Sequence, residues 1–130
     1  MPGAQADLIY IVSKDELRWP AKKLTWKARS GPHGLNHLPA GLYEVARDEI
    51  TPYTEQIDPG FRDKSGKGFF VPLYPKFKES RDGFGVHPDG NDPGTEGCIG
   101  ISKNAKKFHD EMAKIAPGKS LTLRVRKREP

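Results

Sequence analysis

Cys98 and His87 are the residues of this chain whose types and spacing suit nucleophilic catalysis. Attack by cysteine requires a thiolate, a nearby base, and donors directed at the oxygen that becomes negative in the tetrahedral intermediate. Because a free thiol has a pKa of about 8.5, an imidazole must lower that pKa or accept the proton at neutral pH. The sequence therefore predicts a catalytic pair in which Cys98 is the nucleophile and His87 its base.

The segment between these two residues is rich in turn formers. The loop at positions 88–94 contains prolines and glycines and is able to fold the chain back from His87 toward Cys98. Gly94 and Gly97 permit backbone angles that other residues avoid, so the N–H groups of Gly97 and Cys98 are expected to point at one oxygen. An alternative stays open: a lone cysteine beside an isoleucine is often a small buried apolar residue, and this segment would then be a core strand.

Composition indicates a single globular domain over residues 1–130. Hydrophobic residues make up 35% and charged residues 30% of the chain, a balance typical of a folded domain rather than a disordered one. Cys98 is the only cysteine, so the chain has no internal disulfide framework. The net charge of +5 favours an anionic partner such as nucleic acid, lipid head groups or the acidic polymers of a bacterial envelope. A solvated strand end is the alternative for the basic C-terminal cluster, which comprises Arg124, Arg126, Lys127 and Arg128.

Apolar periodicity predicts a mostly β (α+β) domain with one main helix after the cysteine. Residues 8–12 and 17–19 form a predicted hairpin, and further strands are predicted at 24–28, 42–45, 69–74, 83–87 and 121–126. Pro72 places its strand at an edge or a bulge. The helix is expected to begin just after Cys98, with Ser102 as its cap. Its apolar face comprises Ala105, Phe108, Met112 and Ile115.

The N-terminal residues show no basic segment followed by an apolar stretch, which a signal peptide requires. No apolar run approaches the ~20 residues of a transmembrane helix. We therefore expect a soluble protein that is made in the cytoplasm without a signal peptide and has no membrane span.

The segment from His87 to Ile99 resembles the active-site motif of L,D-transpeptidase (YkuD-type) catalytic domains, in which a histidine precedes a Ser/Thr-His-Gly-Cys run. It is also similar to the shorter Gly-x-x-Gly-Cys-Ile variant of type VI secretion effectors and phage-encoded relatives. The likeness continues through residues 101–104, the helix and the last strand. Upstream, residues 38–43 are similar to the Pro-x-Gly-x-Tyr/Phe strand start of the family.

This resemblance implies an L,D-transpeptidase-like β-sandwich that acts on peptidoglycan stem peptides without a cofactor. Cys98 would attack the carbonyl at the L-centre of diaminopimelate and form a thioester. His87 would accept the thiol proton and later protonate the leaving amine, while the Gly97 and Cys98 amides hold the oxyanion and Thr95 orients the loop. Water as the acceptor gives a carboxypeptidase or endopeptidase, and an amine gives transpeptidation. The sequence leaves both open.

The chain departs from the family pattern at two positions. Glu96 stands where the family has a histidine two places before the cysteine, and Gly100 stands where it has an asparagine two places after it. Only eleven positions separate His87 and Cys98, so the usual substrate-binding insertion is expected to be trimmed. We expect Glu96, Gly94 and His33 to contact the substrate.

Two other classes of function remain possible at this stage. His33 and His37 together with His87 and Cys98 form a conceivable zinc set, but Gly34 and the nearby prolines oppose a helix that would align the first two, and we expect no metal. A non-enzymatic module would use the basic C-terminal strand, with Trp19 or Trp26 as exposed aromatics, to hold nucleic acid or an anionic polymer.

The expected partners follow from the enzymatic hypothesis. They are peptidoglycan stem peptides and, for an antibacterial effector, an immunity protein or secretion machinery, with no nucleic acid. Such an effector or a phage lysis enzyme would act at the periplasm or cell wall after delivery by other machinery.

Overall fold

A computed structural model describes residues 6–30, 38–89 and 98–128 of the chain. The strands are β1 (Leu8–Ile11), β2 (Glu16–Trp19), β3 (Leu24–Arg29), β4 (Gly41–Val45), β5 (Val71–Pro75), β6 (Gly85–Pro88), β7 (Ile99–Ile101) and β8 (Leu121–Arg126). The α-helix of this part of the chain is α1 (Ala105–Ala113), and short 3-10 turns lie at Val12–Lys14, Pro20–Lys22, Arg47–Glu49 and Pro59–Phe61. The predicted mostly β fold with one main helix is confirmed.

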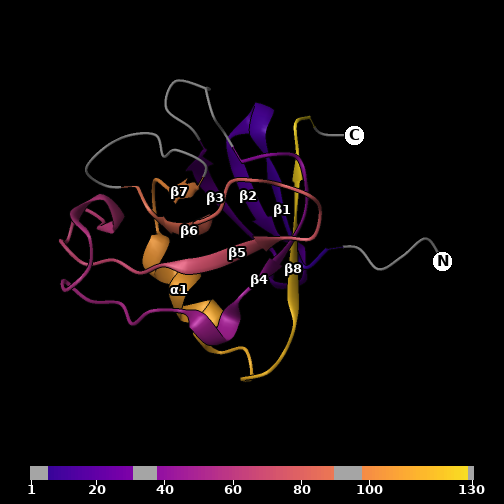
Figure 1. Cartoon of the computed structure of the whole chain (residues 1–130). Coiled ribbons are helices and arrows are strands. Elements are labelled where there is room, and N and C mark those ends of the chain that lie inside the picture. The colour runs from indigo at the N-terminus through magenta and orange to yellow at the C-terminus, as the bar shows by residue number, and fades with distance from the viewer. Residues whose placement is uncertain (1–5, 31–37, 90–97, 129–130) are drawn as a thin grey trace.

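The eight strands form a closed barrel in the order β1-β2-β3-β7-β6-β5-β4-β8 (Figure 1). Two neighbouring pairs in this order are parallel, β1 with β8 and β6 with β7. The pair of β1 and β8 joins the two ends of the sheet. The resemblance implied a β-sandwich, and the hydrogen bonding instead leaves no strand of the barrel with an open edge. Pairing of the first strand with the last is the step that local sequence patterns do not reveal.

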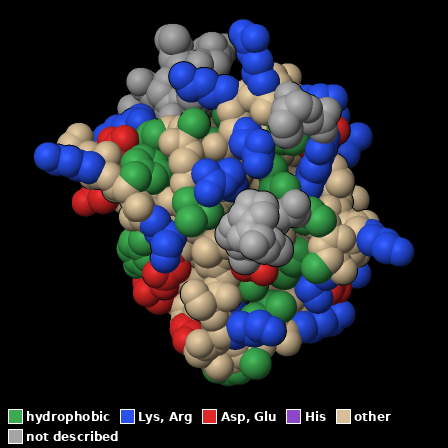
Figure 2. All heavy atoms as spheres, turned by 90° about the vertical axis from the view of Figure 1, so that its right-hand side faces the viewer, with side chains coloured by type: hydrophobic (Ala, Val, Ile, Leu, Met, Phe, Trp, Pro, Cys, Tyr) green, Lys and Arg blue, Asp and Glu red, His purple; other side chains and the backbone are tan. Residues whose placement is uncertain are grey.

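Along each strand, side chains that fill the barrel alternate with side chains that point outward. In β8, Leu121, Leu123 and Val125 are buried, while Arg124 and Arg126 are exposed. Figure 2 shows Lys and Arg side chains spread over the face of the molecule that carries β1 and β8. The C-terminal basic cluster defined above is therefore a solvent-exposed one.

The helix contributes its apolar face to the same core. Phe108 is fully buried, and its ring meets Trp19, Trp26 and Phe69 at centroid distances of 6.1, 5.2 and 6.1 Å. Trp19 and Trp26 are only 2% and 3% exposed, so the prediction that they are exposed aromatics for a polymer is wrong. Burial of their large rings in the core outweighs any use at the surface.

Two local predictions also differ from the structure. Ser102 does not cap the helix, because its backbone N–H continues the ladder of β3 by donating to the carbonyl of Lys27 at 2.9 Å. The strand β7 separates Cys98 from α1, whose N-cap is Asn104 with a φ of 58°. Pro72 lies inside the closed barrel and not at an edge: it pairs with Gly85 of β6, and on its other side its carbonyl accepts from the N–H of Ala46, just past the end of β4.

Among the described residues, no helix combines the length and apolar character needed to cross a bilayer.

Phe108→Ala is expected to lower the free energy of unfolding by about 3–5 kcal/mol, because it removes a fully buried ring from the contact between helix and barrel. Urea titration followed by circular dichroism measures this change. Lys119→Ala, at an exposed position before β8, serves as the control and is expected to change stability by no more than about 0.5 kcal/mol. Equal effects of the two substitutions would contradict the assignment of Phe108 to the core.

Candidate active site

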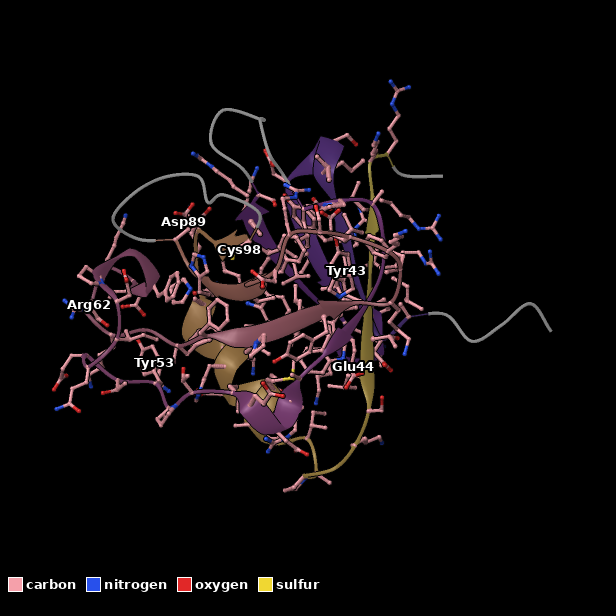
Figure 3. All side chains as sticks on the ribbon, viewed as in Figure 1. Tyr43, Glu44, Tyr53, Arg62, Asp89 and Cys98 are labelled. Carbon is pink, nitrogen blue, oxygen red and sulfur yellow. The ribbon has the colours of Figure 1, made fainter. Side chains whose placement is uncertain are left out.

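The parallel register of β6 and β7 brings His87 and Cys98 to one face of the barrel. Val86 pairs with Ile99 and His87 with Gly100. Because Val86 and Ile99 belong to the core, their neighbours His87 and Cys98 point to the outer face. Cys98 is then one step diagonal from His87, at about 8 Å between α-carbons for a strand spacing of ~4.8 Å and a two-residue rise of ~6.6 Å. Figure 3 labels Cys98, which directly precedes β7, and Asp89, which follows the other end of the paired strand β6.

Cys98 lies at the start of β7 against the backbone of β6. Its side chain is 8% exposed, and its thiol donates to the carbonyl of Gly83 at 3.5 Å. Burial raises the pKa of the Cys98 thiol, and a hydrogen bond from the backbone of Gly85 opposes this rise. The resting thiol is therefore protonated at neutral pH, so that attack requires a base to take its proton.

His87 has the properties of such a base. It is 1% exposed, and burial lowers the pKa of its imidazole, whereas the carbonyl of Pro88 and the carboxylates of Asp89 and Asp58 act to raise it. The Nδ1 atom lies 2.7 Å from the carbonyl oxygen of Pro88. Because a carbonyl only accepts hydrogen bonds, Nδ1 carries the proton, and Nε2 of the neutral ring presents a lone pair.

Two aromatic rings fix the plane of this imidazole. The ring of Phe61 lies 4.4 Å from that of His87, and Phe70 stacks on His87 at 6.2 Å with an interplanar angle of 15°. Phe70 packs directly over Gly85, where a Cβ atom would come within 2.2 Å of the ring. Glycine at position 85 therefore allows the aromatic cover to approach β6.

Sequence reasoning did not find Phe61, Phe70 or Gly85. The available signal was the glycine two places before His87, which alternation places on the same face of the strand as the imidazole. The two phenylalanines come from a segment that no short motif connects with the site.

The remaining predicted site residues cannot be placed. Gly94, Thr95, Glu96 and Gly97 lie outside the described residues, as do His33 and His37. Within the described ranges, no three His, Cys, Asp or Glu side chains converge on a possible metal position. The structure thus sets Cys98 and His87 on one face, one diagonal step apart, and the proposed oxyanion loop lies outside the described residues.

Comparison with known proteins assigns no family to this site. No protein-family model matches the chain, and no curated protein matches its sequence. The candidate site is therefore characterised by its own geometry.

Stability is expected to depend on the titration of His87. A folded-state pKa below the unfolded value of about 6.5 means that the unfolded chain binds the proton first. The stabilisation is then fully present above pH ~6.5 and is lost as the pH falls toward the folded pKa. Urea titrations between pH 7.5 and 5.5 should show that the free energy of unfolding decreases as the pH is lowered.

His87→Gln should reduce this slope. The carboxylates with lowered pKa values, Asp63, Glu79, Asp110 and Glu111, stay ionised in this pH range and do not contribute. Identical slopes in the wild type and in His87→Gln would refute the burial argument.

Alkylation of Cys98 should reflect its raised pKa. We expect the rate with iodoacetamide to rise with a midpoint above the ordinary thiol value of about 8.5, because burial disfavours the thiolate. The same protein unfolded in urea is the control and should react with a midpoint near that ordinary value. A folded-state midpoint below the unfolded one would show that the resting thiol is already ionised.

Proposed function

We propose that this protein is a cysteine enzyme that acts on the stem peptides of peptidoglycan through a thioester on Cys98. The observation that carries the proposal is the register of β6 and β7, which sets a nucleophile and a neutral imidazole on the same face, one diagonal step apart. The tautomer inferred from the Pro88 contact leaves Nε2 as the basic nitrogen. The resemblance of residues 87–99 to the L,D-transpeptidase motif supplies the substrate class.

The reaction begins with two neutral groups. Sγ of Cys98 attacks the peptide carbonyl while Nε2 of His87 takes the thiol proton, so the carbonyl oxygen becomes negative. The backbone N–H groups of Cys98 and Gly97 are the proposed donors to this oxygen, each contributing up to ~3 kcal/mol in comparable sites. The imidazolium then protonates the leaving amine, the C–N bond breaks, and a thioester remains on Cys98. Water or an amine attacks the thioester and restores the thiol.

An L,D-transpeptidase-like fold is part of this proposal. The mostly β architecture and the single helix after Cys98 support it, with the eight strands closed into a barrel. The short motif variant further supports a role as an antibacterial effector or phage lysis enzyme that acts at the cell wall after delivery. An immunity protein or secretion machinery would then be its protein partner.

The decisive experiment is mass spectrometry of products after incubation with purified disaccharide tetrapeptides. The wild type should release the terminal D-residue, or exchange it for an added amine, and a thioester adduct should be captured on Cys98. Cys98→Ala should abolish turnover while lowering stability by only about 1 kcal/mol, because it removes a single buried atom. His87→Gln should lower kcat/KM at least about a hundredfold.

His109→Gln is the matched control for the histidine substitution, because this residue lies on α1 and contacts the carbonyl of Thr51 instead of the thiol face. Full activity of Cys98→Ala would refute the proposal. An unchanged muropeptide profile after the wild type is directed to the periplasm of a Gram-negative cell would also refute it.

A further inference from the structure

An arginine shares the outer face of the barrel with the catalytic pair. In the register of the sheet, Arg29 of β3 pairs with Gly100 of β7, which in turn pairs with His87 of β6. All three therefore occupy one row across three strands. Gly100 contributes no side chain, and two strand spacings separate the α-carbons of Arg29 and His87 by ~10 Å. The exposed Arg29 side chain is thus the next one along the row from the proposed base.

Arg29 also lines a surface cavity of about 250 Å³. The cavity is lined by Asp15, Lys27, Ala28, Arg29, Ser102 and Lys103. Lys27 lies opposite Ser102, two rows away from the pair Arg29 and Gly100 and on the same face, as the register and the hydrogen bond from Ser102 to the Lys27 carbonyl show. Three cationic side chains therefore face one carboxylate in this cavity.

These three cations are available to a ligand. Within the described part of the chain, no ion pair involves any of the three side chains, Lys27, Arg29 and Lys103. Elsewhere the molecule does pair its lysines: Lys107 lies 3.1 Å from Glu111. Among the described residues, the cavity thus holds three cationic side chains against the single carboxylate of Asp15.

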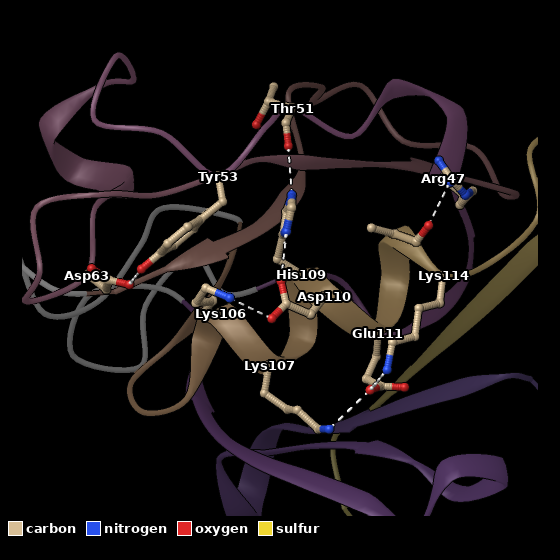
Figure 4. A network of polar contacts seen from close by, with 11 residues as sticks. Arg47, Thr51, Tyr53, Asp63, Lys106, Lys107, His109, Asp110, Glu111 and Lys114 are labelled. Atoms are coloured by element: carbon tan, nitrogen blue, oxygen red, sulfur yellow. Dashed lines mark hydrogen bonds and ion pairs between the residues drawn. The ribbon is translucent and has the colours of Figure 1, made fainter.

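A second cavity of about 380 Å³ shares Ser102 and Lys103 with the first one. Some of its lining side chains already have polar partners within the protein. Figure 4 shows Lys106 directed at Asp110 and the Tyr53 hydroxyl directed at Asp63. Lys106 and Asp63 of this cavity are therefore already partnered. Arg29 lines only the first of the two cavities.

We propose that the cavity formed by Lys27, Arg29 and Lys103 is a substrate subsite that binds a carboxylate of the peptide whose carbonyl Cys98 attacks. This inference rests on the proposed function, which places the reacting carbonyl at Cys98, one diagonal step across the sheet from Arg29 at the near end of the cavity. A guanidinium presents a rigid pair of donors that matches a carboxylate, so Arg29 is the principal contact and the lysines add attraction. The small volume of about 250 Å³ favours one acidic residue of a peptide over a polyanion, which would need a continuous basic track.

The test compares two probes: a disaccharide tetrapeptide with free carboxylates, and the same compound with its side carboxylates amidated. Arg29→Gln should raise KM for the free form about tenfold, with most of the loss in KM rather than in kcat. Lys27→Gln and Lys103→Gln should each raise it about threefold. On the amidated form, Arg29→Gln and the wild type should have equal KM values.

Arg124→Gln is the matched control. Arg124 is also an exposed arginine on a strand, but β8 is four strands from β7 in the barrel order. It should leave KM unchanged for both compounds. An equal loss in Arg29→Gln and Arg124→Gln, or a loss that persists on the amidated compound, would overturn the subsite.

Binding of the same probes to the Cys98→Ala protein, followed by calorimetry, separates this inference from the proposed function. If the wild type shows no turnover but binding still weakens in Arg29→Gln only for the free carboxylate form, the enzymatic proposal fails and the subsite stands. If a 12-nucleotide oligonucleotide displaces the peptide and binds more tightly at Arg29, the cavity serves nucleic acid and the subsite is refuted.

Discussion

The parallel hydrogen-bonded pair of β6 and β7 is the constraint on which the candidate site depends. Both strands are short, and their register is set by Val86 and Ile99, which occupy the core of the barrel. Because side chains alternate along a strand, this register obliges His87 and Cys98 to face outward. A slip of one residue in either strand would turn one of them into the core and separate the pair. Core packing therefore determines how the two side chains of the candidate site lie relative to each other.

The same arrangement controls the protonation of the two groups. Phe61 and Phe70 cover His87 and exclude water from it, and the backbone around Gly83 surrounds the thiol. Desolvation disfavours the charged forms of both, which raises one pKa and lowers the other. The candidate site thus holds a neutral thiol and a neutral imidazole on one face. On the proposed function, proton transfer is coupled to attack on the substrate, so that the negative charge develops on the carbonyl oxygen instead of on sulfur.

The features that the sequence predicts well are local. Alternation identified the hairpin of β1 and β2 and the strand β8, and helical periodicity identified the buried face of α1 around Phe108. Barrel closure was missed because it depends on pairing Leu8–Ile11 with residues 123–126, at the other end of the chain. The prediction of a helix cap at Ser102 was wrong for a related reason, because the backbone N–H of Ser102 donates to the carbonyl of Lys27 in a distant strand. Non-local hydrogen bonds outweighed local preference in both cases.

The candidate site shows the same difference between local features, which the sequence predicts, and non-local ones, which it does not. Residue type and motif sufficed to find Cys98 and His87, but the groups around them come from strands and loops distant in sequence. Gly85 and Gly100 lie opposite Cys98 and His87, respectively, so each functional side chain faces a glycine on the neighbouring strand. Gly85 admits the ring of Phe70, and Gly100 leaves the row toward Arg29 without an intervening side chain. On the proposed function, this face also carries a cation supplied from β3, at a place that only the three-strand register reveals.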